Sequence, residues 1–370
     1  MAMTPLAPPL LPSLDALDFL ADMQAAGRPS RLTRRTPTPS RTPVEVPLPG
    51  GGVNPADLYV APQAPRCGLL LVPGVARGGK DEPRMVALAE RFARLGFAVL
   101  VPHLATLNQL NVRPYHRDLV VASFAYLASQ PAWCPEGRAG IGGLSFAMGT
   151  GTLAALDPAI AAHVRFIFCI GGYFDLLAQC RFATTGWHQP VGPDGRRGAW
   201  TYTRPDHYGR WVLGAGLATH IQAPDAQAAF REMVDRRLAQ AGAPLDDLEA
   251  RLTTPDAQAL FAYIEHNGRD RYEERWEALL PSMRQDLHDL DVSTRDLAPL
   301  RARLILVHGL LDNLIPPDHS AALHHAVPAG QSHLYRVGGL RHVTLLRPGP
   351  VGLYRLLASL TDLLNERAAL

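Results

Sequence analysis

The sequence predicts an α/β fold in which a mostly parallel, twisted sheet is flanked by helices and interrupted by a helical insertion. Up to residue 175, apolar strand-like runs alternate with segments of helical periodicity, a pattern typical of a parallel sheet. Residues 176–298 replace this alternation with a long, mostly helical pattern. The alternation then resumes, so residues 299–370 are expected to complete the same sheet.

Composition limits the classes of function. With 370 residues, 47% of them apolar, the chain can form one large α/β domain with an insertion and a substantial core. A net charge of +2 gives no excess of positive field, so no nucleic-acid partner is expected. Four scattered cysteines favour reduced thiols in a cytoplasmic protein. No signal peptide or integral membrane segment is expected, because no apolar run approaches the roughly 20 residues that span a bilayer.

The first 43 residues are expected to form a helix and a basic linker. Residues 13–27 suit an amphipathic helix with Ser13 as N-cap and Leu14, Leu17, Leu20 and Met23 near one face. We expect it to dock on the same chain, with a dimer contact or a membrane-surface helix as alternatives, so a homodimer is possible. Residues 28–43 contain five arginines, four prolines and no acid, which favours an extended, solvated linker.

The core is expected in two parts, residues 44–175 and 299–370. The first part begins with the runs VEVPL, ADLYV and CGLLLV, which we interpret as an antiparallel entry to the sheet. Further elements follow in order: a helix over 83–95, the strand FAVLV, a helix over 113–127, the strand HVRFIFCIGG, the strand LILV, a helix over 318–326, the strand HLYRV and a helix over 351–367.

The insertion, residues 176–298, is expected to act as a helical cap over a crevice. Its predicted helices cover residues 224–241, 245–252, 255–266 and 271–290. Its first part is rich in aromatic side chains, namely Trp187, Trp200, Tyr202, Tyr208 and Trp211. Some of these side chains could line a pocket, whereas packing inside the cap is the alternative for each.

A candidate nucleophile, Ser145, lies where an apolar run turns into a helical pattern. A serine between strand and helix sits on a strained turn, so the residues two before and two after it must be small. Gly143 and Ala147 occupy those positions. The sequence GLSFA departs from the usual G-x-S-x-G by one alanine, and a glycine-rich loop without chemistry is the alternative.

A serine hydroxyl needs a histidine base oriented by a carboxylate, and both candidates follow Ser145 in the chain. Asp312 and His342 each lie just after a strand-like run. The carboxyl ends of parallel strands meet at one crevice, so three groups placed in this way can converge. Asp175, which follows another predicted strand, is the alternative acid. By contrast, His308, His324 and His325 are expected to make structural hydrogen bonds.

Four segments, LVPG before a helix, GLSFA, HGLLDNLIPP and GGLRH, occur in this order. With them the chain resembles the α/β-hydrolase superfamily, particularly bacterial serine hydrolases of the dienelactone-hydrolase-like and esterase-like branch, over roughly residues 44–366. The resemblance implies an α/β-hydrolase fold and a serine esterase acting on a small ester-like substrate. It also implies an oxyanion hole formed by the backbone N–H groups of Val75, or else Ala76, and Phe146. Dienelactone hydrolases carry a cysteine nucleophile, so their substrate is not implied.

Two other site types are not expected. Residues 74–80 fit the phosphate-loop pattern G-x-x-x-x-G-K, but Asp81 stands where a magnesium-binding Ser or Thr is needed. No HExxH or similar spacing indicates a metal, and no cofactor is implied. The alternatives to an esterase are a peptidase or thioesterase with the same triad, or a non-catalytic binding module on the same fold.

Overall fold

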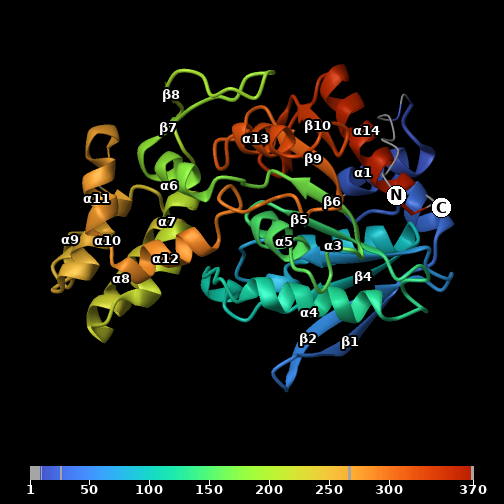
Figure 1. The fold of residues 1–370 in the computed structure, drawn as a ribbon, viewed down its shortest axis with the longest axis horizontal. Helices are drawn as coiled ribbons and strands as arrows, with labels where there is room; N and C mark the ends of the chain where they lie inside the picture. The colour runs from blue at the N-terminus through green and yellow to red at the C-terminus, as the bar shows by residue number, and fades with distance from the viewer. Residues whose placement is uncertain (1–8, 10, 26, 266–267, 368–370) are drawn as a thin grey trace.

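The computed structural model describes residues 9, 11–25, 27–265 and 268–367. Within them, an eight-stranded sheet runs through the molecule with helices on both faces (Figure 1). Its strands are β1 (Ser40–Pro47), β2 (Val53–Val60), β3 (Cys67–Val72), β4 (Phe97–Pro102), β5 (Ala139–Leu144), β6 (Val164–Ile170), β9 (Arg303–Gly309) and β10 (Ser332–Val337).

The strand order is β1-β2-β4-β3-β5-β6-β9-β10. β1 pairs with β2, and β2 with β4, in antiparallel fashion, whereas every pair from β4 to β10 is parallel. The predicted mostly parallel sheet is therefore confirmed, and the runs VEVPL and ADLYV form the expected antiparallel entry. The third run, CGLLLV, was wrongly included in that entry, because β3 is parallel to both of its neighbours, β4 and β5. At the carboxyl edge, Ile170 of β6 lies opposite Leu144 of β5 and Val307 of β9, so the segments after these strands begin side by side.

Both faces of the sheet are covered, which explains why strands such as CGLLLV are apolar throughout rather than alternating. Leu70 and Val72 belong to one core cluster, and Leu69 and Leu71 to the other, as the two-residue period of a strand requires. The first cluster includes side chains of α4 (His116–Ala128), α5 (Ala147–Ala155) and α13 (Asp318–Ala326); the second includes those of α1 (Leu14–Ala25), α3 (Pro83–Arg94) and α14 (Pro350–Asn365).

Helix α1 docks on the body of its own chain, as expected. The backbone N–H of Ser13 donates to Thr361 Oγ1 of α14 over 2.9 Å, and the Phe19 ring lies 5.1 Å from that of Phe92 in α3. The buried face differs from the predicted one, since Leu14 and Leu17 are exposed while Ala16, Phe19 and Leu20 are buried. Residue 26, near the end of the predicted helix, lies outside the described residues.

The basic segment 28–43 is not an extended linker throughout. It contains a short helix, α2 (Arg31–Arg35), and the first strand of the sheet begins at Ser40. Ser30 closes a capping box with Thr33, because each side chain accepts a hydrogen bond from the other residue's backbone N–H. Arg35 pairs with two acids of α1, Asp15 and Asp18. The composition of residues 28–43 predicted a solvated linker, because the acidic partners of Arg35 lie in α1, outside this segment.

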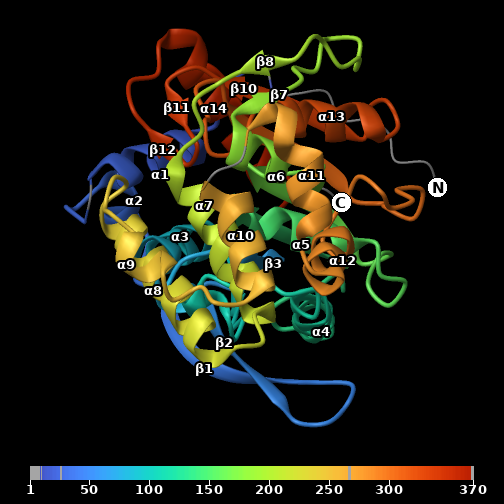
Figure 2. The same ribbon diagram turned by 90° about the vertical axis from the view of Figure 1, so that its left-hand side faces the viewer.

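The insertion between β6 and β9 lies beside the sheet, at the left of Figure 1 and facing the viewer in Figure 2. It contains α6 (Leu176–Thr185), a hairpin of β7 (Trp187–His188) and β8 (Thr201–Tyr202), α7 (His207–Leu217), α8 (Pro224–Ala239), α9 (Asp246–Glu249), α10 (Pro255–Glu265), α11 (Tyr272–Ala278) and α12 (Pro281–Asp289). Short 3₁₀ helices cover Gly79–Asp81, Leu107–Gln109, Ala218–His220 and Arg269–Arg271.

One expected helix of the insertion is wrong. The predicted helix over 271–290 is two helices, because α11 ends at Ala278 and α12 begins at Pro281. Proline lacks a backbone N–H and disfavours a helical conformation in the residue before it, so Pro281 starts a new helix. Residue 266, where the predicted helix 255–266 ends, lies outside the described residues.

Candidate active site

Ser145 lies on a tight turn between β5 and α5, with a φ of +60°. The left-handed conformation costs a non-glycine residue on the order of 1–2 kcal/mol, so the surroundings must hold it. The backbone N–H of Ser145 donates to Ile170 O of β6 over 2.8 Å, and Met148 N–H donates to Ser145 O over 3.2 Å. A Cβ added at Gly143 would lie 3.1 Å from Val72 O and 2.8 Å from Met148 Sδ, which leaves little room for a side chain two residues before the serine.

His342 and Asp312 form a hydrogen-bonded pair beyond the ends of β10 and β9. His342 lies between the short strands β11 (Leu340–Arg341) and β12 (Thr344–Leu345), with a φ of +50°. Its Nδ1 donates to Asp312 Oδ2 over 2.9 Å. The other carboxylate oxygen, Oδ1, accepts the backbone N–H groups of Leu314 and Ile315, each over 2.9 Å. Nδ1 of His342 therefore carries the proton, and Nε2 is left as the basic nitrogen.

A second histidine lies behind the acid. His308 Nε2 is 3.3 Å from Asp312 Oδ2 and donates to Ile315 O over 2.9 Å, while its Nδ1 accepts from the Ser320 hydroxyl over 2.6 Å. Burial alone would raise the pKa of Asp312, but the hydrogen bonds from His308 and His342 outweigh it and hold that pKa well below its usual range. The carboxylate is therefore ionised at neutral pH. His308 makes the hydrogen bonds expected of it, and it also supports the acid.

Gly171, which the sequence analysis did not single out, allows the Asp312–His342 pair to lie against the end of β6. It follows Ile170 and has a φ of +63°. A Cβ added there would lie 3.3 Å from Asp312 Oδ2 and 3.3 Å from His342 Nδ1. The Asp312–His342 pair therefore lies against the residue that follows Ile170, and the Ile170 carbonyl accepts the Ser145 N–H. The glycine pair at the end of the predicted strand HVRFIFCIGG was the signal that could have identified it.

Asp175, the alternative acid, has other partners. Its Oδ1 accepts the Ala178 N–H and caps α6 over 2.8 Å, and its Oδ2 pairs with Arg197 over 2.6 Å. The acid that the structure brings to His342 is Asp312. Among the described residues, Ser145 Oγ has no hydrogen-bond partner, so the bond between serine and imidazole is not made. In free enzymes such bonds are often long and form only with substrate bound.

A cavity of about 90 Å³ opens beside Ser145. Its wall is mostly apolar and comes from both the sheet side and the insertion, including Val75, Phe146, Leu176, Cys180, Val212, Leu213, Leu287, Leu290, Leu314 and Ile315. Polar side chains of the insertion also line it. Gln179 donates through Nε2 to Leu314 O, and its Oε1 has no partner among the described residues. Asp286 pairs with Arg113 over 2.7 Å and His220 over 2.9 Å. No motif in the sequence pointed to either residue.

Tyr208 of α7 connects the insertion to the loop after β3. It lines the cavity, and its hydroxyl donates to Val75 O over 2.9 Å. In a trans peptide the next N–H points away from that carbonyl, so the Ala76 N–H faces away from Tyr208. In the described part of the chain, the N–H groups of Val75 and Phe146 have no hydrogen-bond partner.

The other aromatic side chains of the insertion lie elsewhere. Trp211 is buried against Phe230 inside the insertion, and Tyr202 is exposed beside Trp187. Trp187 and Trp200 line a different cavity. Tyr208 is therefore the one of the five expected aromatics that lines the cavity at Ser145, and its position could not be read from the pattern.

The remaining candidates from the sequence have structural surroundings. Lys80, in the phosphate-loop-like segment, pairs with buried Asp57 over 2.8 Å and with Asp81 over 3.1 Å. Within the described residues, no group of three or more His, Cys, Asp or Glu side chains is arranged to hold a metal. The same residues contain no helix with the length and apolar character needed to span a bilayer. All four cysteines are free and buried.

The strand order, the antiparallel β2 and the strand–turn–helix that carries Ser145 define an α/β-hydrolase fold. No protein-family model and no curated protein matches the sequence. Solved structures with some likeness include a hyperthermophilic esterase from the archaeon Pyrobaculum calidifontis, with 13% identity, a TM-score of 0.47, and coverage of 97% of this chain and 95% of that one.

Two further structures with some likeness are also hydrolases by name. Dienelactone hydrolase from Anabaena variabilis has 14% identity and a TM-score of 0.43, over 88% of this chain and 98% of that one. A puromycin-hydrolyzing peptidase from Mycobacterium tuberculosis has 14% identity and a TM-score of 0.46, over 88% of this chain but 38% of the peptidase. At such identities and TM-scores, neither an activity nor a substrate is transferred to this chain.

Proposed function

We propose that the chain is a serine hydrolase that cleaves carboxylic esters through an acyl-enzyme. The observation that carries the proposal is the Asp312–His342 hydrogen bond. This pair lies against Gly171, and the preceding residue, Ile170, accepts the backbone N–H of Ser145, which has a positive φ. A serine on such a turn, with an imidazole whose Nδ1 is fixed by a buried carboxylate, is the arrangement that nucleophilic acyl transfer requires.

In the proposed reaction, Ser145 Oγ attacks the acyl carbon while His342 Nε2 takes its proton. The imidazolium then returns the proton to the leaving alkoxide, and water, deprotonated by the same nitrogen, releases the acid. Asp312 orients the imidazole and stabilises its charged form. The open N–H groups of Val75 and Phe146 are proposed to stabilise the oxyanion, with Tyr208 fixing the loop that carries Val75.

The size and lining of the cavity suggest the substrate class. A volume of about 90 Å³ is small beside the roughly 300–1,000 Å³ of common ligand pockets, so it suits a short acyl chain. Apolar side chains dominate its wall, and burying each methylene against them contributes about 0.8 kcal/mol. We therefore propose esters of two- to four-carbon acids as the best substrates.

We propose that the insertion acts as the cap of this pocket. It provides α6, α7 and α12 to the cavity wall. Two ion pairs also link it to the sheet side, the partly buried pair of Asp286 with Arg113 and the exposed pair of Asp235 with Arg77. Exposed pairs contribute little, so the Asp286–Arg113 pair at the cavity wall is the contact that favours a cap that shapes the acyl pocket over one that swings freely.

The test is a substrate screen with the Ser145→Ala protein as background. We expect p-nitrophenyl acetate or butyrate to give the highest kcat/KM and p-nitrophenyl octanoate to fall at least about tenfold below it, because the longer chain exceeds the cavity. Acyl thioesters and p-nitroanilides serve as the comparison, because amides and thioesters would use the same groups. Higher kcat/KM on either would reassign the substrate class, and turnover no higher than that of Ser145→Ala on any compound would favour a binding module.

A further inference from the structure

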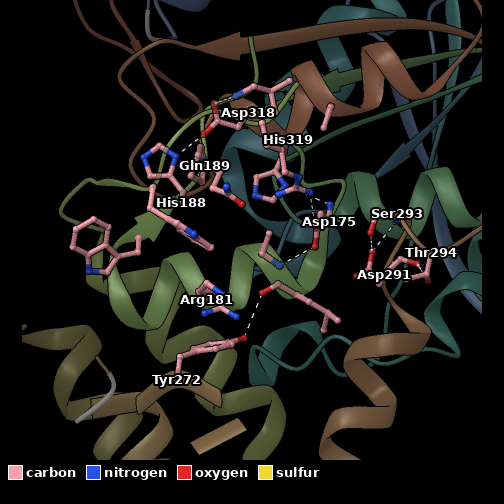
Figure 3. Close-up of a pocket in the computed structure, with 18 of the residues that line it drawn as sticks. Asp175, Arg181, His188, Gln189, Tyr272, Asp291, Ser293, Thr294, Asp318 and His319 are labelled. Atoms are coloured by element: carbon pink, nitrogen blue, oxygen red, sulfur yellow. Dashed lines mark hydrogen bonds and ion pairs between the residues drawn. The ribbon is translucent and has the colours of Figure 1, made fainter. Parts of the chain in front are cut away.

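A second cavity, of about 410 Å³, is lined in part by residues of α6, including Arg181 (Figure 3). Leu177, Ala178 and Arg181 face this cavity, whereas Leu176, Gln179 and Cys180 line the one at Ser145. Residues three and four positions apart share a face of a helix, so α6 separates the two cavities. The larger cavity is therefore distinct from the proposed catalytic pocket, and nothing in the proposed reaction uses it.

Carboxylates outnumber cationic side chains in the wall of this cavity. The acids are Asp175, Glu273, Asp291 and Asp318, against the guanidinium groups of Arg181 and Arg197 in the wall and that of Arg269, which lies over the Trp187 and Trp200 rings. Three of the acids have partners within the fold. Asp175 pairs with Arg197, Glu273 with Arg181, and Asp318 with His188 over 2.6 Å. Asp291 remains without a cationic partner among the described residues.

Asp291 is the most unusual of these groups, since it is only 1% exposed. Its Oδ1 accepts the backbone N–H and the hydroxyl of Ser293, over 2.8 and 2.7 Å. Its Oδ2 is buried without a hydrogen-bond partner in the described part of the chain. Burial, with the nearby Asp175 carboxylate, raises the pKa of Asp291 even though the Ser293 hydrogen bonds and the nearby Leu176 N–H act to lower it. Leaving such an oxygen unpaired costs about 1–3 kcal/mol or more, which a donor or a positive charge would relieve.

Aromatic rings form another part of the wall: those of Trp187, Trp200, Tyr272 and Trp276. Some of them already pack against flat cations of the chain itself. The Arg181 guanidinium lies 3.9 Å from the centre of the Tyr272 ring, and that of Arg269 lies 4.8 Å from the centre of the Trp187 ring. Ring faces attract cations through their quadrupole, so this wall favours both positive charge and apolar surface.

We propose that this cavity is a binding site for an organic cation, namely a protonated amine carried on an aromatic or apolar body. The ammonium group lies beside Asp291 and offsets its unpaired charge. The body packs against Trp200 and Trp276. An acidic ligand is disfavoured by the excess of carboxylates, and a neutral ligand leaves Asp291 unpaired.

Tryptophan fluorescence can test this directly, because Trp187, Trp200 and Trp276 of the five tryptophans line the cavity. The probes are 2-phenylethylamine, which is protonated at neutral pH, and its neutral and acidic counterparts 2-phenylethanol and phenylacetate. We expect a saturable change with the amine and affinities at least about tenfold weaker for the other two. Asp291→Asn should weaken binding of the amine at least about tenfold, and the matched control, Asp296→Asn at an exposed position outside the cavity, should leave it unchanged.

Equal binding of amine and alcohol, amine binding that is unaffected by Asp291→Asn, or no saturation would each overturn the proposal. If Asp291→Asn does not fold, Trp200→Leu replaces it, since Trp200 is 39% exposed and the change removes a ring that packs on the amine's body. It should then weaken amine binding, and unchanged affinity would overturn the proposal. The titration needs no turnover and works equally with Ser145→Ala, so its failure is distinct from a failure of the proposed esterase activity.

Discussion

Replacing Asp312 with asparagine changes one atom of the proposed triad, and the structure fixes the consequence. The two carboxylate oxygens face donors, with Leu314 N–H and Ile315 N–H at Oδ1 and the two histidines at Oδ2. An amide nitrogen at Oδ1 would face two backbone donors that cannot turn away, at a cost of about 1–3 kcal/mol for each unmade bond. The amide oxygen therefore stays at Oδ1, and the NH₂ group faces His342.

In that orientation His342 Nδ1 must accept a hydrogen bond, so its proton moves to Nε2. Nε2 can then no longer take the proton of Ser145. We expect kcat to fall by about 10⁴, equivalent to about 5 kcal/mol of transition-state stabilisation. The assay is the initial rate on p-nitrophenyl butyrate for purified proteins, with thermal melting to show that the variant is folded.

The matched control is Asp175→Asn, because asparagine can still cap α6 through the same Oδ1 hydrogen bond to Ala178 N–H. We expect it to change kcat by less than about fivefold. A loss of less than tenfold for Asp312→Asn, or a larger loss for Asp175→Asn, would refute the assignment of the acid.

Three further predictions follow from individual contacts. Tyr208→Phe removes the 2.9 Å hydrogen bond to Val75 O and should lower kcat about tenfold with little change in KM, whereas an effect on KM alone in steady-state kinetics would contradict a positioning role. Gly171→Ala places a methyl group 3.3 Å from the Asp312–His342 pair and should lower kcat at least tenfold, so an unchanged rate would count against that geometry. Burial lowers the pKa of His116 from 6.5 to about 4, so the folded protein binds fewer protons than the unfolded chain between these values. Stability should then fall as the pH drops through this window, by up to about 1.4 kcal/mol per pH unit from this group, and equal slopes for wild type and His116→Asn in urea titrations would contradict it.

Features set by local pattern could be predicted from the sequence. The predicted helix over 318–326 coincides with α13, and the apolar run CGLLLV is the buried strand β3. A continuous apolar run is what a strand covered on both faces needs. The order of strands and turns then placed Ser145, Asp312 and His342 at one edge of the sheet before any contact was known.

Features that depend on distant partners could not be predicted. Asp291 looks like any other acid in the sequence, and its unpaired oxygen results from the packing of α6 and the segment after α12 around it. Helix α2 was not predicted, because its Arg35 pairs with acids of α1 that lie outside the basic segment. Pro281, where α12 begins, is visible in the sequence, but the helical periodicity on both sides of it led to the prediction of one continuous helix. Tyr208 reaches Val75, 133 positions earlier in the chain, which no local pattern encodes.

Covalent labelling with a fluorophosphonate tests most directly whether Ser145 is an activated nucleophile. Intact mass spectrometry and peptide mapping of the folded protein should show one adduct, on the peptide that carries Ser145. The adduct should be absent in Ser145→Ala, and its formation should be at least about 10³-fold slower in His342→Ala, because the hydroxyl then lacks its base. A folded wild-type protein that gains no adduct, or gains it on another residue, would contradict the proposed mechanism.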